Sequence, residues 1–435
     1  MTDLLDTDAR VCWHPFTQAA TAPPPLPVVR GSGAWLELAD GRRVFDGLSS
    51  WWSTLHGHAH PKLVEAIATQ AATLDHVLFA GCTHPPAVRL ANRLVDVAPE
   101  GMSRVFYSDD GSTAVEVALK MAFQLQLNRD EPERRRFLCL EGGYHGDTIG
   151  AMSAGDPGVF GEPFAPLLFD VDRLVPPLTH GRRGQPPRGT DEALVEVDRR
   201  LASEPHAAVV VEPMVQGAAG MRMMPPEFLA GLRGLCDEHG ALLIADEVMT
   251  GFGRTGRMFA LEHAGVSADL MCLSKGITGG TLPLAATLAP ESIYEAFLDE
   301  DMRRGFLHGH TYTANPIACA VANASLDLLL DGGLERAASI ERFYASRLPS
   351  FEDHPAVDHV RWMGTIGVVE LAGGASGYYN PIGQRVQVAM LERGHLVRPL
   401  GPVIYTMPPL CTTQEELHAL YDALEDVLHG EVGVG

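Results

Sequence analysis

Two ionisable residues stand directly after short apolar runs that have the length of buried strands. Asp246 follows the run 241–245, and Lys275 follows the run 270–273 with one serine between them. Burying an unpaired charge at the end of a strand is costly, so each of these groups needs an opposite charge or a ligand. The pattern therefore has two interpretations: a structural ion pair between Asp246 and Lys275, or one bound molecule that contacts both.

A glycine and two hydroxyl residues lie where a third apolar run passes into a predicted helix. Gly111, Ser112 and Thr113 separate the run 104–107 from an amphipathic stretch that extends to residue 127. A helix N-terminus offers unpaired backbone N–H groups and partial positive charge, which suit a phosphate, although an ordinary helix cap gives the same pattern. Taken with the aspartate and the lysine, the three signals fit pyridoxal phosphate, whose phosphate, ring nitrogen and aldehyde need these three kinds of group.

Two other motifs suggest different chemistry. Residues 251–256 (GFGRTG) match the G-x-G-x-x-G pattern of dinucleotide-binding loops, but the match begins five residues after Asp246 and no acid follows a strand about 20 residues on. His56, His58 and His60 alternate along the chain as metal ligands on one strand face would. No carboxylate or cysteine has matching spacing, so we expect no metal, and the role of the three histidines stays open.

The elements that must position these residues alternate between strand-like and helix-like periods. Apolar runs at 104–107, 137–140, 207–211, 241–245 and 270–273 alternate with helical stretches such as 112–127 and 226–238, which predicts an α/β domain with a mostly parallel sheet. After residue 310 two helical stretches, two strands and a closing helix predict a smaller α+β domain. We expect residues 1–55 to join the small domain, 56–310 to form the large one and 311–435 the small one.

Length, charge and composition restrict the class of protein. The chain has 435 residues, enough for two or three domains, and its 46% hydrophobic share is ordinary for an enzyme. The formal net charge of −22 disfavours nucleic acid and anionic membranes as partners. The sequence has no targeting pattern at its start and no run of about 18 apolar residues, so the expected location is the cytoplasm.

Several longer motifs carry a resemblance to a known family. They are residues 13–17 (WHPFT), 46–52 (DGLSSWW), 143–148 (GYHGDT), 251–256 (GFGRTG), 273–280 (LSKGITGG) and 308–316 (HGHTYTANP). With Gly111 and Ser112 they make nearly the whole chain resemble the ω-aminotransferase group of fold-type I pyridoxal phosphate enzymes, the class III aminotransferases. The resemblance implies a pyridoxal phosphate-dependent transaminase.

The resemblance also implies roles for the residues around the cofactor. Lys275 resembles the lysine that binds the cofactor, and Asp246 the partner of its ring nitrogen. Tyr144 is expected to stack on the ring, and Gly111 and Ser112 to bind the phosphate. Thr311 would reach the phosphate of a neighbouring subunit, which implies a homodimer with composite active sites.

Within the family, the WHP, SSWW and YHGD segments most resemble enzymes of biotin biosynthesis that aminate 8-amino-7-oxononanoate to 7,8-diaminononanoate. Arg398 resembles the arginine that binds the carboxylate of this keto acid, because a guanidinium fork matches a carboxylate. The other substrate-binding residues expected from the resemblance are Trp51, Phe16, Asp147, Arg254, His310 and Tyr405.

Two positions depart from the usual pattern of that branch, and both bear on the amino donor. Phe16 replaces a tyrosine and His310 replaces a proline, as in members that use lysine as donor. The retained WHP and SSWW segments favour S-adenosylmethionine, which we take as the expected donor with lysine as the alternative. Another ω-aminotransferase, a 1,2-aminomutase, a nicotinamide oxidoreductase and a non-catalytic protein of this fold are the competing interpretations.

Overall fold

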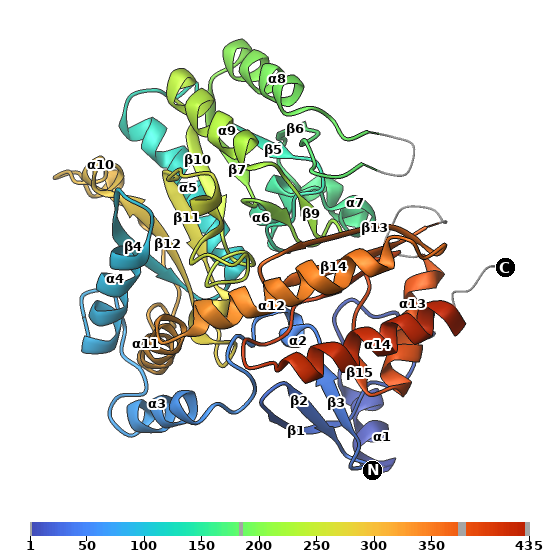
Figure 1. Cartoon of the computed structure of the whole chain (residues 1–435). Helices are drawn as coiled ribbons and strands as arrows, with labels where there is room; N and C mark the ends of the chain where they lie inside the picture. Colours follow the sequence, from blue (N-terminus) through green and yellow to red (C-terminus); the bar gives the residue numbers. More distant parts are fainter. Residues whose placement is uncertain (1, 182–185, 373–379, 431–435) are drawn as a thin grey trace.

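A seven-stranded sheet forms the centre of the larger part of the molecule. The computed structural model describes residues 2–181, 186–372 and 380–430 (Figure 1). Within them the strands pair in the order β4-β12-β11-β10-β7-β5-β6, and β12 runs antiparallel to both of its neighbours. The other pairs are parallel, which confirms the predicted mostly parallel sheet. The strands are β4 (Met102–Ser108), β5 (Arg136–Leu140), β6 (Asp172–Leu174), β7 (His206–Val211), β10 (Leu242–Asp246), β11 (Leu270–Leu273) and β12 (Ala285–Pro290).

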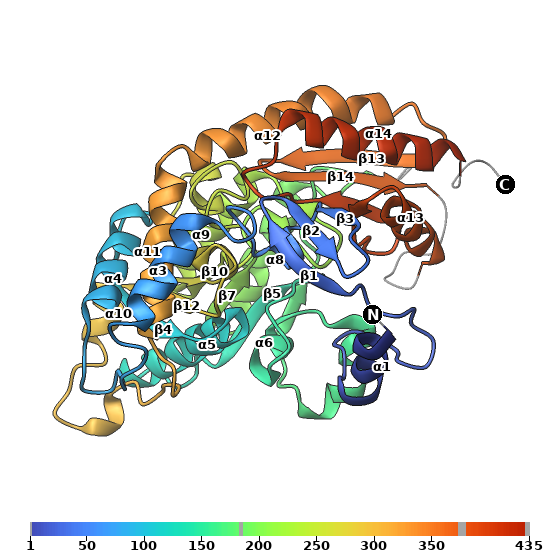
Figure 2. The ribbon, with the colours of Figure 1, turned by 90° about the horizontal axis from the view of Figure 1, so that it is seen from below.

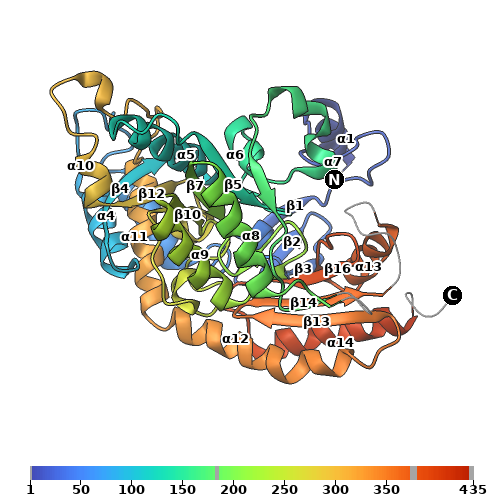
Figure 3. The ribbon, with the colours of Figure 1, turned by 90° about the horizontal axis from the view of Figure 1, so that it is seen from above.

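Helices cover both faces of this sheet, as Figures 2 and 3 show. Helices α5 (Gly111–Asn128) and α6 (Ile149–Ala154) lie on one face, and α8 (Thr190–Ser203) and α9 (Pro226–His239) on the other. Strand β10 serves both layers: Leu242 and Ile244 belong to the core beneath α5, and Leu243 and Ala245 to the core beneath α9. This alternation explains why the strand is apolar along its whole length.

Three further helices pack together beside the sheet. These are α3 (Pro61–Ala71), α4 (Pro85–Val97) and α11 (Pro316–Leu330). Helix α11 also contacts the short helix η3 (Lys275–Thr278), which begins at the lysine singled out above. The predicted domain boundaries at residues 55 and 310 stay a prediction. They assign α11 to the small domain, whereas its packing partners α3, α4 and η3 lie in the range 56–310 predicted for the large one.

The smaller part of the molecule is built from two small sheets and a helical layer. Strands β13 (Val357–Met363), β14 (Ile366–Leu371) and β16 (Val403–Thr406) form one sheet, which α12 (Gly333–Arg347) and α14 (Gln414–Gly430) cover (Figures 2 and 3). Helix α13 (Pro381–Glu392) packs on α14. The other sheet has the order β1 (Val28–Ser32), β2 (Trp35–Leu38), β3 (Arg43–Asp46) and β15 (His395–Leu396). Because β3 pairs with β15, a segment near the start of the chain joins one near its end.

The remaining elements are short, except for the first helix. They are α1 (Thr2–Val11), α2 (Ser49–Trp52), α7 (Gly158–Gly161), η1 (Glu162–Leu167), β8 (Val215–Gln216), β9 (Arg222–Met223), η2 (Ala260–His263), α10 (Glu291–Glu295), η4 (Met302–Arg304) and η5 (Leu348–Phe351). In the described ranges no single helix has the length and apolarity to cross a membrane, whereas the bent pair 316–330 and 333–351 passes that test on length and composition alone.

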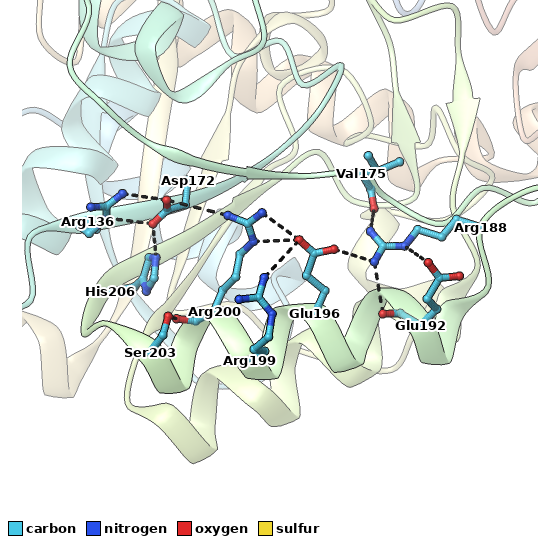
Figure 4. Close-up of polar contacts among 10 residues, drawn as sticks. All are labelled: Arg136, Asp172, Val175, Arg188, Glu192, Glu196, Arg199, Arg200, Ser203 and His206. Atoms are coloured by element: carbon cyan, nitrogen blue, oxygen red, sulfur yellow. Dashed lines mark hydrogen bonds and ion pairs between the residues drawn. The ribbon is translucent and has the colours of Figure 1, made fainter.

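A network of ion pairs ties the edge strand β6 to helix α8 (Figure 4). Asp172 of β6 accepts hydrogen bonds from Arg136 and lies 2.9 Å from Nε2 of His206. Arg200 connects Asp172 with Glu196, which also binds Arg188 at 2.8 Å. We call this set, with Glu192 and Arg199, the α8 network. The network lies at the edge of the sheet, where it stabilises β6, a strand that pairs on one side with β5.

Candidate active site

The carboxyl ends of the parallel strands bring polar residues from five chain segments to one cavity. Asp246 ends β10, Lys275 follows β11, and Glu212 follows β7. The loop after β5 adds Tyr144 and His145 to the same wall, and the loop after β4 adds residues 109–112. The cavity has a volume of about 1630 Å³, which is larger than the 300–1,000 Å³ of an ordinary ligand pocket.

Asp246 is buried and is held in place by two hydrogen bonds. Its Oδ2 lies 2.7 Å from Nδ1 of His145, and its Oδ1 accepts a hydrogen bond of 3.1 Å from the backbone N–H of Val248. Burial alone would lower the pKa of His145, but the hydrogen bond to Asp246 and the charges of Asp246 and Glu212 raise it above the ordinary value. The protonated form of the buried His145 is therefore favoured beside Asp246.

Glu212 is a second buried carboxylate of the cavity. Its Oε2 accepts a hydrogen bond of 3.0 Å from the backbone N–H of Tyr144, and its Oε1 accepts one of 2.9 Å from Gly217. Burial raises the pKa of Glu212 to about 7, while the charge of His145 opposes this rise. Glu212 fixes the backbone of the loop that carries Tyr144.

Lys275 supplies the amine of the cavity from a strained backbone position. Its φ is +45°, a left-handed conformation that is unusual outside glycine and is found at functional sites. Burial lowers the pKa of Lys275, and the charges of Asp246 and Glu212 oppose that decrease. Its Nζ lies 5.3 Å from the centre of the Trp52 ring. We call Lys275, Asp246, His145, Glu212 and Tyr144 the cavity cluster.

The start of α5 forms the third part of the predicted cofactor site. Asp110 caps the helix through a reciprocal pair of hydrogen bonds with Thr113, which leaves the N–H groups of Gly111 and Ser112 toward the cavity end. A Cβ on Gly111 would lie 2.6 Å from Val248, and one on Gly146 would lie 2.0 Å from Oγ of Ser112. Side chains of Val248 and Ser112 fill the space that a Cβ at either glycine would need, so both positions require glycine beside the start of α5. An amine, a carboxylate and a helix N-terminus on one cavity fit pyridoxal phosphate.

Aromatic rings and one arginine form the wall around Lys275. Trp52 is buried, and its indole N–H donates a 3.0 Å hydrogen bond to the hydroxyl of Tyr405. Trp51 lies under the guanidinium of Arg398, whose Cζ is 4.6 Å from the ring centre, and it meets the ring of Phe16 edge-on at 5.7 Å. Trp51, Phe16, Arg398 and Tyr405 thus line the cavity, and their expected contact with substrate stays a prediction.

Tyr144 and Asp147 also line the cavity, and the Tyr144 hydroxyl donates a 3.0 Å hydrogen bond to Asp147. Arg254, by contrast, is buried behind the cavity wall, where its guanidinium donates to the carbonyls of Trp52, Thr54 and Pro408. Because these bonds hold the backbone that carries the tryptophans, the structure gives Arg254 a supporting position, and direct contact with substrate stays a prediction.

His310 and Thr311 lie outside the cavity of their own chain. Nδ1 of His310 is 3.2 Å from Oδ2 of Asp109, and Thr311 is exposed. Two of the three alternating histidines have separate partners: His56 lies 3.1 Å from Oγ of Ser325, and His58 lies 2.8 Å from Oδ2 of Asp46, whereas the His60 ring lies 6.3 Å from the His56 ring. Among the residues that the structure describes, no three His, Cys, Asp or Glu side chains gather as metal ligands would.

Sequence reasoning missed two members of the cavity cluster. Glu212 directly follows the apolar run 207–211, the same signal that identified Asp246, so this residue was within reach of the same argument. His145 stood inside the quoted GYHGDT motif, but its contact joins residues 101 positions apart and no local pattern indicates it. Phe160 of α7 also lines the cavity and had no signal.

Known proteins resemble the chain over nearly its whole length. The class-III aminotransferase family matches residues 16–428 of the chain. The adenosylmethionine-8-amino-7-oxononanoate aminotransferase of Synechococcus elongatus is 52% identical over 96% of this chain and 98% of its own. The crystal structure of the enzyme of that name from Methanocaldococcus jannaschii has a TM-score of 0.91 and 35% identity, and covers 98% of this chain and 99% of its own. A Pseudomonas jessenii ω-transaminase in complex with PMP has a TM-score of 0.92 at 28% identity, with 99% of this chain and 100% of its own covered.

The match extends over both parts of the molecule and over every strand end that contributes to the cavity. The chain therefore belongs to the class-III aminotransferases and is a pyridoxal phosphate-dependent transaminase of fold type I.

Proposed function

We propose that this transaminase converts 8-amino-7-oxononanoate to 7,8-diaminononanoate in biotin biosynthesis, with S-adenosylmethionine as the amino donor. The observation that carries the proposal is the seat of Arg398 over Trp51, in the same cavity as Lys275. A guanidinium across an apolar wall from a reactive amine suits a substrate with a carboxylate at one end and a carbonyl further along its chain. The names of the full-length relatives support the same substrates.

Pyridoxal phosphate, when bound, supplies the electron sink that makes amino transfer feasible. In the proposed site Gly111 and Ser112 bind its phosphate through backbone N–H groups, and Tyr144 covers its ring. Asp246, oriented by His145, holds a proton at the ring nitrogen. Lys275 Nζ binds the cofactor in the resting enzyme and carries the proton between carbon atoms, for which its lowered pKa is suited because a neutral amine accepts a proton.

Substrate recognition is proposed for the walls of the cavity. Arg398 binds the carboxylate of the keto acid, and Trp51, Phe16 and Tyr405 contact its carbon chain. Asp147 accepts the hydrogen bond of the Tyr144 hydroxyl and lines the cavity, and its carboxylate is proposed to bind a substrate amine.

We also propose that the protein is a homodimer with composite active sites. Thr311 and His310 do not line the cavity of their own chain, and the neighbouring Leu307 and Tyr312 are 65% and 60% exposed. An exposed apolar surface around residues expected at a phosphate supports their use by a second copy. Sedimentation at several concentrations tests this proposal, and a monomer at micromolar concentration would contradict it. The cytoplasmic location stays a prediction.

Lysine is the second candidate donor, because Phe16 lacks a hydroxyl and His310 can bear a charge. The deciding experiment measures formation of diaminononanoate from the keto acid with each donor, together with single-turnover loss of cofactor absorbance. We expect S-adenosylmethionine to support both. Turnover with lysine but not with S-adenosylmethionine would show that lysine is the donor. If neither amine supports formation of diaminononanoate, the proposed function is refuted.

A further inference from the structure

Four side chains form a continuous series of ring contacts from α7 to the arginine of the cavity. Phe160 of α7 meets the ring of Phe16 edge-on, with centroids 5.6 Å apart and an interplanar angle of 84°. Phe16 meets Trp51 in the same way at 5.7 Å and 67°. The guanidinium of Arg398 then covers the Trp51 ring at 4.6 Å. All four residues line the cavity.

The two tryptophans of this region are held by different means. Trp52 is 5% exposed and its indole is bonded to Tyr405. Trp51 is 39% exposed and lies in a run of left-handed residues, where its own φ is +129°. A backbone in this region is strained for a tryptophan, so surrounding contacts must stabilise its conformation. Two such contacts of the Trp51 ring are the Phe16 edge and the Arg398 guanidinium over the ring face.

Phe16 itself depends on support from elsewhere. It is 43% exposed, it has a φ of +50°, and it lies in the segment that connects α1 with β1. Besides Trp51, the ring of Phe160 packs on it edge-on. Because edge-to-face contacts depend on angle as well as distance, removing Phe160 frees Phe16 to turn and releases the edge of Trp51.

We propose that Phe160 is a positioning residue for carboxylate recognition: through Phe16 and Trp51 it fixes the ring on which Arg398 rests. The inference rests on the proposed role of Arg398 in binding the substrate carboxylate. It adds Phe160, from α7, to the residues that determine carboxylate recognition. A cation over an aromatic face is held in direction as well as position. The guanidinium fork then meets the substrate carboxylate without first being ordered.

The test uses holoenzyme and two probes that differ in one group, nonanoate and nonanamide, with binding measured by calorimetry. Phe160→Ala is expected to weaken nonanoate binding by about 3- to 10-fold, the range for loss of one aromatic pair, and to leave nonanamide binding within twofold. Phe160→Tyr keeps the ring and is expected to restore nonanoate binding. Phe164→Ala removes a phenylalanine that is 44% exposed and lies outside the cavity, so it serves as the matched control and should change neither probe.

A second arm repeats the measurement in an Arg398→Ala background, where Phe160→Ala should have no further effect on nonanoate. Equal weakening of both probes, an additive effect in that background, or no nonanoate binding to the wild type would each overturn the inference. Failure of the proposed function gives a different result: nonanoate binding depends on Phe160 and Arg398 as expected, but no diaminononanoate forms from the keto acid.

Discussion

The cavity cluster and the α8 network each contain a histidine paired with an aspartate at nearly the same distance. His145 lies 2.7 Å from Asp246, and His206 lies 2.9 Å from Asp172. The surroundings differ: the side chain of Asp246 is 5% exposed, whereas Asp172 is 20% exposed and also binds Arg136, which is 44% exposed. Solvent and arginines compensate the charge of Asp172. Asp246 is nearly closed off from solvent, so its partners are protein groups such as His145 and the backbone N–H of Val248.

This difference in compensation appears in the titration of the two regions. Burial would raise the pKa of Asp172, but Arg136 and His206 lower it. In the cavity burial dominates and raises the pKa of Glu212 to about 7. The same residue types therefore act as a surface clamp in one region and as chemically poised groups in the other, because dry surroundings strengthen every charge interaction. Variants that exchange one group at a time can test this contrast.

The largest contrast is expected for Lys275. Lys275→Ala should lower turnover by at least about 10³-fold, because it removes the group that binds the cofactor and transfers the proton. Borohydride should attach the cofactor covalently to Lys275 in the wild type, as peptide mass spectrometry would show. Arg200→Ala in the α8 network is the matched loss of a cation and should leave turnover unchanged. A Lys275→Ala protein with near-normal turnover would mean that another amine does the chemistry.

Asp246→Asn and Asp172→Asn remove the same charge from the two histidine–aspartate pairs. In the cavity the change should cost about 10²- to 10³-fold in rate while cofactor binding persists, because a neutral amide no longer stabilises a proton at the ring nitrogen. At the α8 network the rate should be unchanged. Steady-state rates and the cofactor absorbance of both proteins give the comparison, and equal rate losses would show that Asp246 acts only through folding.

Arg398→Lys keeps the charge of the carboxylate anchor and removes its fork. We expect the keto-acid half-reaction to lose about 1 to 3 kcal/mol, measured from kcat/KM, with little change in the donor half-reaction. Arg188→Lys makes the same change in the α8 network and should have no kinetic effect. Equal damage to both half-reactions of the Arg398 variant would argue that this residue also serves the donor.

Glu212→Gln tests the titration of the buried cluster. The folded-state pKa of Glu212, about 7, is above the ordinary value of 4.5, so the folded protein holds this proton more tightly than the unfolded chain. Its contribution to stability is therefore full below about pH 4.5 and is lost as the pH rises through 7. Relative to the wild type, the glutamine variant should gain up to about 3 kcal/mol between pH 5 and pH 8. Melting temperatures of both proteins at pH 5 and pH 8 provide the measurement. An equal difference between variant and wild type at the two pH values would show that Glu212 does not change its protonation between them.

The contrast between the regions also explains which features the sequence predicts. Strand ends are local signals, so Asp246, Lys275 and the turn at 111–112 were found from apolar runs and the polar residues that end them. The run 270–273 was predicted with the observed bounds of β11. The His145–Asp246 pair and the Arg398–Trp51 contact join distant segments, and their geometry depends on tertiary packing. The buried position of Arg254 could not be inferred from its glycine loop, because three carbonyls from two other segments create it.

The smallest effect is expected at the α8 network itself. Arg188 binds Glu196 at 2.8 Å, Glu192 at 3.4 Å and the carbonyl of Val175 at 2.7 Å, and its side chain is 15% exposed. Arg188→Ala should cost at most about 1 kcal/mol at low salt, and less at 1 M salt, where screening weakens its ion pairs but leaves the bond to Val175. Arg199, 67% exposed and 3.8 Å from Glu196, provides the control, since Arg199→Ala should change neither stability nor activity. Thermal unfolding at two salt concentrations measures both variants. A salt-independent loss would show that Arg188 acts mainly through the carbonyl that anchors the strand β6 segment, whereas a loss of turnover would show that the two regions are coupled.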